Sequence, residues 1–300
     1  MDRSEVTEII ACLPRERTIY TYARDQYAFG LLTRLARARQ TIRDVRNSQF
    51  AALLEKPQVK NVLSACGDGR LSEDTIKEGA GSVTAHDYLL GLTVWGDPHD
   101  RLYSQTSRRG YNLVLQLNLN HGDMKRFATL VDYPADYNVE SHPSSKVSDR
   151  RHRTTLAWAR LDVSWHTDEV LVEELQSDFV RIVEWYRERH RDHAAVRAFC
   201  KPFRAVWQEA MLNAVVEFIW TELGVRHIYF HDHLTGAAMK RLSGELPPRS
   251  VYTELPRKFC MNAHREAPQY LMQNRSARRA LSKIKKPCFY RLSLDDFACC

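Results

Sequence analysis

The chain has 300 residues, of which 44% are hydrophobic and 27% charged, and its formal net charge is +7. These values are ordinary for a globular protein with a sizeable core. No apolar run is long enough to span a membrane, and the charged N-terminus lacks the order of a secretory signal. Seven scattered cysteines without a CxxC pair argue against a disulfide framework or a zinc knuckle. We therefore expect a cytoplasmic protein that does not act at a membrane.

The first part of the chain, residues 1–105, is expected to be mostly helical. Apolar residues recur at helical spacing between Tyr27 and Leu35, and a second helical segment ends at Pro57. Residues 64–70, SACGDGR, have the composition of a turn, and they lack the Lys-Ser/Thr ending of a phosphate-binding P-loop.

From residue 111 the period of the pattern changes from helix to strand. In YNLVLQLNLN, four leucines alternate with other residues and so lie on one face of a strand. Residues 132–153 read as a long exposed loop, a kind of segment that often carries function. Two further strands are expected at 155–165 and 170–175, joined in a hairpin by the turn 166–168.

The rest of the chain alternates helices with strands. A helix begins near Ser177 or Asp178, and a long apolar helix ends at Gly224. A strand at 225–230, a short helix capped by Thr235, a basic helix and a final strand complete the pattern. Residues 106–300 are thus expected to form an α/β (or α+β) domain, a mixed sheet flanked by helices.

The most unusual segment is VLVEELQSDF, residues 170–179, which places a cluster of polar residues at the end of an expected strand. Open α/β sheets bind ligands at such ends, and a half-buried carboxylate there acquires a raised pKa suited to general acid or base chemistry. Strand alternation sends Glu173 and Glu174 to opposite faces, so one of them is expected to act. We favour Glu174, because it shares a face with Gln176. The structural alternative is an edge strand followed by an ordinary helix cap at Asp178.

The run E-E-L-Q-S-D-F resembles the E-E-[IVL]-Q-S-D-[WF] signature of domains in large phage and mobile-element polyvalent proteins and their stand-alone bacterial relatives. The similarity extends over about residues 155–260 through Pro202-Phe203, Trp207, Gly224, Thr235-Gly236 and Tyr252. It departs from the signature at Phe179, usually Trp, and at Val180, where a His is common. The resemblance implies a catalytic site built on Glu173, Glu174, Gln176 and Asp178 and a phage-related biology. It implies no particular reaction.

The leading hypothesis is an enzyme that acts on a nucleotide, a nucleic acid or another anionic substrate. Its substrate-binding candidates are Ser177, Trp207, Lys240, Arg241 and Tyr252. Basic residues that would bind the anion or nucleic acid are Arg150, Arg151, Arg153, Arg278, Arg279 and Lys283. A non-catalytic nucleic-acid-binding module is the alternative from another class.

Two further hypotheses concern different chemistries, and the sequence identifies no cofactor and no protein partner. His166 and Asp168 form an H-x-D motif, which with His231 and Arg241 suggests an Fe(II)/2-oxoglutarate-like oxygenase. His227, His231 and His233 would share one strand face and are also metal-ligand candidates. The order of elements after residue 202 is similar to the end of the acetyltransferase fold, although the glycine-rich pyrophosphate loop of that fold is missing.

Overall fold

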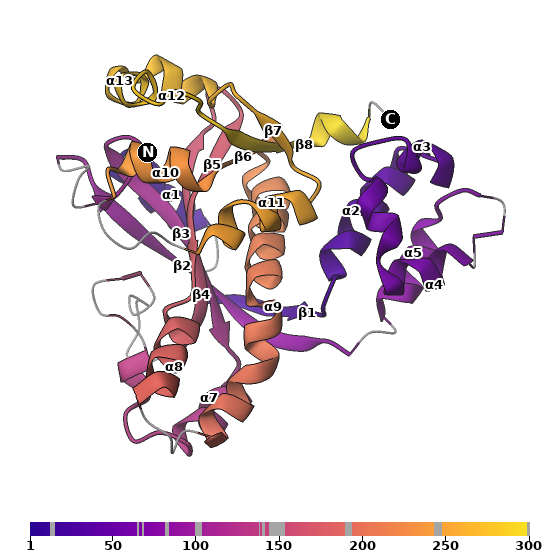
Figure 1. Ribbon diagram of the computed structural model, residues 1–300, viewed down its shortest axis with the longest axis horizontal. Helices are drawn as coiled ribbons and strands as arrows, with labels where there is room; N and C mark the ends of the chain where they lie inside the picture. Colours follow the sequence, from indigo (N-terminus) through magenta and orange to yellow (C-terminus); the bar gives the residue numbers. More distant parts are fainter. Residues whose placement is uncertain are drawn as a thin grey trace.

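The computed structural model describes residues 1–12, 16–64, 66–67, 69–81, 84–99, 104–137, 139, 142–143, 154–189, 194–242 and 248–298. Its centre is an eight-stranded sheet with the strand order β1-β2-β3-β4-β5-β6-β8-β7 (Figure 1). The strands are β1 (Glu16–Tyr22), β2 (His86–Asp97), β3 (Gly110–Leu119), β4 (Thr155–Ser164), β5 (Glu169–Gln176), β6 (His227–His231), β7 (Asn262–His264) and β8 (Phe289–Ser293). Among these described strands, β5 and β6 pair in parallel and the other neighbours are antiparallel. A mixed sheet flanked by helices confirms the expected α/β class.

A group of short helices lies to one side of the sheet, between β1 and β2 in the chain (Figure 1). The helical segments up to β2 are α1 (Arg3–Cys12), α2 (Gln26–Arg37), α3 (Ile42–Arg46), η1 (Ala51–Glu55), α4 (Pro57–Ser64) and α5 (Glu73–Gly81). Strands β1 and β2 also come from the region expected to be mostly helical, so the sheet crosses the expected boundary at residue 105. Both strands lack a regular alternation of apolar and polar residues, and β2 has adjacent leucines at 89 and 90.

Two helices make the crossover that the parallel pair β5–β6 requires. They are α8 (Asp178–Arg189) and α9 (Ala194–Phe218), followed by a π-helical turn, Ile219–Leu223. As expected, Gly224 ends this segment, with a left-handed φ of 67°. The apolar side of α9 and the leucines of β3 belong to the same large core. We call the side of the sheet that packs on α9 the helical face.

The opposite side of β5, β6 and β8 is covered by C-terminal helices. A second, smaller core there joins Leu171 of β5 and Phe289 of β8 to Met239, Tyr270 and Leu281. The remaining helical segments are α7 (His121–Ala128), η2 (Pro134–Tyr137), α10 (His233–Lys240), η4 (Arg249–Tyr252), α11 (Glu254–Lys258), α12 (Gln269–Gln273), α13 (Arg275–Leu281) and η5 (Leu294–Phe297). In the described parts of the chain, no helix combines the length and the apolar character that crossing a membrane needs.

One expected helix cap is wrong. The cap of α10 is Asp232, whose carboxylate accepts the backbone N–H of Thr235 at 2.7 Å. The hydroxyl of Thr235 instead accepts the N–H of Cys288 at 2.9 Å. Thr235 therefore joins α10 to the start of β8, a tertiary contact that local sequence does not reveal.

Candidate active site

A layer of buried polar side chains lies on β3, β4 and β5, on the side of these strands opposite the helical face. We call this side the polar face. Its residues are Asn112, Gln116, Asn118, Trp158, Arg160, Asp162, Glu174 and Gln176, all buried except the partly exposed Gln176. They repeat with the period of two that also places the leucines of β3 on the helical face. That period was the signal for Asn112, Gln116, Asn118 and Arg160, which were not among the site residues predicted from the sequence.

A β-bulge interrupts β5 at Glu173. Arg160 is opposite Glu174, whereas the next residue of β4, Leu161, is opposite Val172, so Glu173 is an extra residue. The prediction that the two glutamates lie on opposite faces is therefore wrong, because a bulge lets consecutive side chains point the same way. Both glutamates are linked to the segment before β3. Glu173 accepts hydrogen bonds from Ser107. Glu174 binds Arg160, which also donates to the carbonyls of Ser104 and Gln105.

Beyond the bulge, β5 and β6 separate, and side chains replace the missing ladder bonds. The last pair in register is Val172 with Phe230. The carbonyl of Glu173 then accepts hydrogen bonds from Nε2 of His231 at 2.8 Å and from Nζ of Lys240 at 2.9 Å. These bonds satisfy a buried carbonyl that has lost its strand partner.

His231 occupies a tightly packed position in this region. Its ring stacks on Tyr252 with a centroid distance of 5.6 Å and an angle of 7°. A Cβ added to Gly236 would overlap the atoms of the ring. The glycine of the Thr235-Gly236 pair is thus explained by close approach of α10 to the histidine. Burial and the nearby charge of Lys240 lower the pKa of His231 to about 3, so the ring is neutral at physiological pH.

The carboxyl group of Glu173 is fully buried and accepts the N–H and the hydroxyl of Ser107, both at 2.8 Å. Burial raises its pKa, because the charged form loses water, and the charges of Lys240 and Arg160 only partly oppose this. Glu173 therefore has the raised pKa expected of an acid, but its position is enclosed.

Glu174 belongs to a buried ion cluster with two cations. Arg160 donates to its carboxylate and also to the carbonyls of Ser104 at 2.7 Å and Gln105 at 3.0 Å. Nζ of Lys240 lies 3.9 Å from the same carboxylate. Although burial works to raise the pKa of Glu174, Arg160 and Lys240 outweigh it and the pKa is lowered. Glu174 is therefore ionised and paired, which is the geometry of a residue that holds cations in place.

Three rings enclose this cluster. The guanidinium carbon of Arg160 lies 5.4 Å from the ring centre of Trp95 and 6.0 Å from that of Trp158. The ring of His142 meets both tryptophans nearly edge-on, at 6.5 Å and 5.8 Å. Cation–π attraction helps to hold Arg160 in a fixed orientation.

Asp178 and His142 form a carboxylate–imidazole pair beside this cluster. Nδ1 of His142 is 3.0 Å from both carboxylate oxygens of Asp178. Asp178 also accepts hydrogen bonds from Trp158 at 2.9 Å, Gln176 at 2.6 Å and Arg181 at 2.6 Å. Burial works to raise the pKa of Asp178, but the bonds from His142 and Trp158 and the charge of Arg181 lower it overall.

His142 was not among the site residues predicted from the sequence, although it belongs to the long loop expected to carry function. An ionised carboxylate only accepts hydrogen bonds, so Nδ1 of His142 carries the proton that it donates to Asp178. The side chain of His142 is 29% exposed, whereas that of Asp178 is fully buried. This is the arrangement of a positioned general base.

The structure brings some of the predicted binding residues together and separates others. Lys240 and Tyr252 join the cluster, and the hydroxyl of Ser177 caps α8 by accepting the N–H of Val180 at 3.0 Å. Trp207 instead lies in the large core with α9, and Arg241 is exposed at the end of α10. Arg278, Arg279 and Lys283 are exposed on or just after α13, while Arg150, Arg151 and Arg153 lie outside the described residues.

The five metal-ligand candidates are dispersed or otherwise engaged. His166 is exposed in the β4–β5 turn, where Asp168 accepts the N–H of Arg226 at 2.9 Å. His227 lies 2.8 Å from the hydroxyl of Ser293, and His231 is bonded to the Glu173 carbonyl. Over the described ranges, no group of three or more His, Cys, Asp or Glu residues, with or without His233, has a metal-binding arrangement.

Comparison of the chain with protein-family models, with curated proteins and with solved structures finds no match in any of the three.

Proposed function

We propose that the protein is an enzyme that performs general acid–base chemistry on an anionic substrate of the nucleotide or nucleic-acid type. His142 is the proton acceptor, and Asp178 is the carboxylate that orients it. The observation that carries this proposal is the 3.0 Å contact of Nδ1 of His142 with both oxygens of a buried, ionised Asp178. Positioned proton transfer of this kind typically contributes about 10²- to 10⁴-fold to a rate.

Unpaired polar atoms on the polar face support the binding of a polar ligand there. Oδ1 of Asn112, Oε1 of Gln116 and Nε of Arg160 are buried, and the described residues offer them no hydrogen-bond partner. An unpaired buried polar group costs about 1–3 kcal/mol, which a polar ligand would offset. In this proposal Glu173, Glu174 and Gln176 act as positioning residues, because each bonds another group of the cluster.

Positive charge on the protein supports an anionic substrate. Arg181 is 57% exposed beside His142, at the start of α8, where the helix dipole also favours a negative group. The net charge of +7 would assist capture of a polyanion.

The test is a turnover screen over nucleotides and short single- and double-stranded oligonucleotides, with products resolved by chromatography and mass spectrometry. We expect turnover by the wild type and a loss of at least about 100-fold in kcat for His142→Asn. His121→Asn, the same change at an exposed histidine of α7, is the matched control and should keep full activity. Equal rates for wild type and His142→Asn, or no turnover of any substrate, would refute the proposal.

A non-catalytic nucleic-acid-binding module remains the second candidate, because one exposed region concentrates positive charge. Its residues are Arg275, Arg278, Arg279, Lys283, Lys285 and Lys286, on and just after α13, and all of them are exposed. This candidate predicts a steep fall of affinity with salt. Arg278→Glu with Lys285→Glu would abolish oligonucleotide binding, whereas Glu173→Gln and Glu174→Gln would leave it unchanged.

The acetyltransferase-like and oxygenase-like hypotheses have less support from the described residues. Strand β5 passes into α8 through Gln176 and Ser177, without the glycine-rich loop that an acetyltransferase-like fold requires. An oxygenase-like site requires His166, Asp168 and His231 in one place. Yet Asp168 accepts a backbone N–H in the β4–β5 turn, and His231 is bonded to the carbonyl of Glu173 beside α10.

A further inference from the structure

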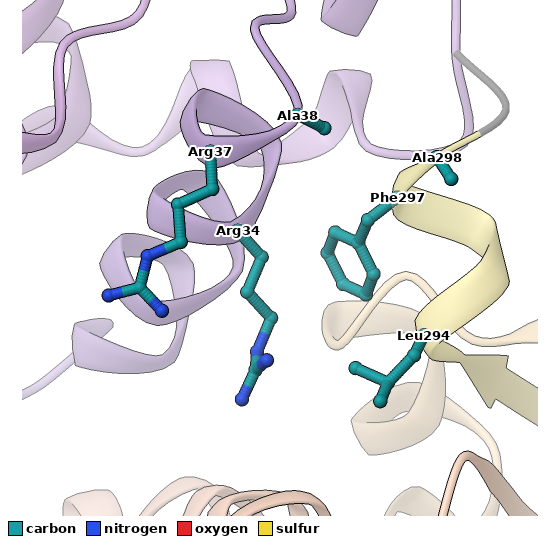
Figure 2. Close-up of a pocket in the computed structure, with 6 residues that line it drawn as sticks. All are labelled: Arg34, Arg37, Ala38, Leu294, Phe297 and Ala298. Carbon is teal, nitrogen blue, oxygen red and sulfur yellow. The ribbon is translucent and has the colours of Figure 1, made fainter.

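A cavity lies away from the polar face, between α2 and the segment η5 that follows β8. It has a volume of about 320 Å³ and is lined by Arg34, Arg37, Ala38, Leu294, Phe297 and Ala298. Figure 2 shows both arginine side chains extending from α2, with Arg34 nearer to the ring of Phe297 on η5 and the Arg37 head group farther from it. Cavities of this size accept small organic molecules.

The charged wall of the cavity is entirely cationic among the described lining residues. The guanidinium carbon of Arg34 lies 4.4 Å from the ring centre of Trp220, so stacking fixes the plane of its donors. Burial lowers the pKa of Arg34, and repulsion from Arg37 adds to this effect. The charge of Glu217 near Arg34 acts against both effects, and an anion bound by both arginines would add a further favourable charge interaction.

Arg37 is held by a partner outside the cavity. Its Nε donates to Glu73 of α5 at 3.0 Å, an exposed ion pair. Because that bond uses only Nε, the two Nη groups of Arg37 can donate to a further acceptor. Planar guanidinium groups match the geometry of phosphate and carboxylate oxygens.

The opposite wall is apolar and well fixed. Phe297 stacks on Phe50 at 4.8 Å and meets Trp220 edge-on at 5.6 Å, which places the ring firmly in the core. Leu294 and Ala298 extend this wall on either side of Phe297. A ligand in the cavity would therefore meet cations on one side and apolar groups on the other.

We propose that this cavity is a binding site for a small organic anion that carries a phosphate or carboxylate on an apolar, preferably planar, body. The oxyanion binds Arg34 and Arg37, and the body packs against Leu294 and Phe297. The site joins α2 to the segment after β8, so its ligand also links two regions that are distant in sequence. It is independent of the chemistry proposed for His142.

The experiment uses three probes on the full chain by isothermal titration calorimetry: phenyl phosphate, inorganic phosphate and benzyl alcohol. Phenyl phosphate carries both features of the proposed ligand, and each of the others carries one. We expect phenyl phosphate to bind at least about tenfold more tightly than either of them. Arg34→Gln and Arg37→Gln should each weaken its binding by about tenfold or more, since each removes a charged donor.

The controls separate this site from other positive charge and from the active site. Arg3→Gln, the same change at an exposed arginine of α1, should not alter the affinity, and neither should His142→Asn. Arg37 is 60% exposed, so its substitution should leave the fold intact, as near-ultraviolet circular dichroism can verify. Wild-type affinity in Arg37→Gln, or equal binding of phenyl phosphate and inorganic phosphate, would overturn the proposal.

Discussion

The two faces of β3, β4 and β5 are buried to the same degree but are built from opposite chemistry. On the helical face, Leu115, Leu117 and Leu161 are completely buried against apolar residues of the large core. On the polar face of the same strands, Gln116, Arg160 and Asp162 are equally inaccessible. Apolar burial is favourable with almost any apolar neighbour, whereas each buried polar group needs a partner of matching chemistry and geometry.

This difference explains how the candidate site is held. Arg160 and Glu174 of the polar face and Lys240 of α10 depend on one another, because removing one weakens the pairing of the buried charges that remain. A core built of leucines has no such specific dependence. Substitutions on the two faces should therefore differ in whether a second substitution can repair the first, and the following predictions test this.

The largest effect is expected at Arg160. The change Arg160→Met should lower the free energy of unfolding by about 3–5 kcal/mol, because Glu174 would keep its charge in a buried site. Adding Glu174→Met should recover part of this loss, since the carboxylate that lost Arg160 is then gone, while Lys240 loses its nearest carboxylate. Urea unfolding of the two single variants and the double variant measures the coupling. Equal stability of Arg160→Met and the double variant would show that the two side chains do not depend on each other.

A somewhat smaller effect is expected on the helical face. Leu115→Ala should cost about 3 kcal/mol of unfolding free energy, because it removes buried apolar surface and leaves a cavity. Leu115→Met, a change of similar volume, should cost less than about 1.5 kcal/mol. The same urea experiment measures both. A loss as large for methionine as for alanine would mean that this face is as specific as the polar one.

The smallest effect concerns pH. The pKa of His231 is lowered to about 3 in the folded protein from a usual value of 6.5, so between these values the unfolded chain binds the extra proton. Stability contributed by this histidine is therefore complete above pH 6.5 and is lost as the pH falls, by up to about 1.4 kcal/mol per unit. Glu173, whose pKa is raised, acts in the opposite direction above the usual glutamate range.

The contribution of His231 is isolated by comparison with His231→Gln, which can still donate to the carbonyl of Glu173 but does not titrate. Unfolding free energies at pH 7 and pH 5.5 give the change of stability with pH for the wild type and for the variant. The wild type should lose more stability on acidification than the variant does. Parallel slopes would show that the ring is already able to accept a proton in the folded protein.

Several features of this protein follow from local sequence alone. Alternation of leucines identified β3, and the apolar segments on either side of the turn 166–168 identified the β4–β5 hairpin. Helical spacing and Gly224 identified the long helix and its end. These features depend on periodicity and backbone conformation within a few residues, and both can be read from the sequence.

The tertiary structure alone decided how the polar residues of VLVEELQSDF are used. The bulge at Glu173 arises from the pairing of β5 with β4, so alternation along β5 could not reveal it. His142 meets Asp178 across 36 positions in the chain, and Ser107 meets Glu173 across 66. The sequence determined that carboxylates gather at this strand end. Which partners hold them is fixed by long-range contacts, because a buried charge is defined by the groups that surround it.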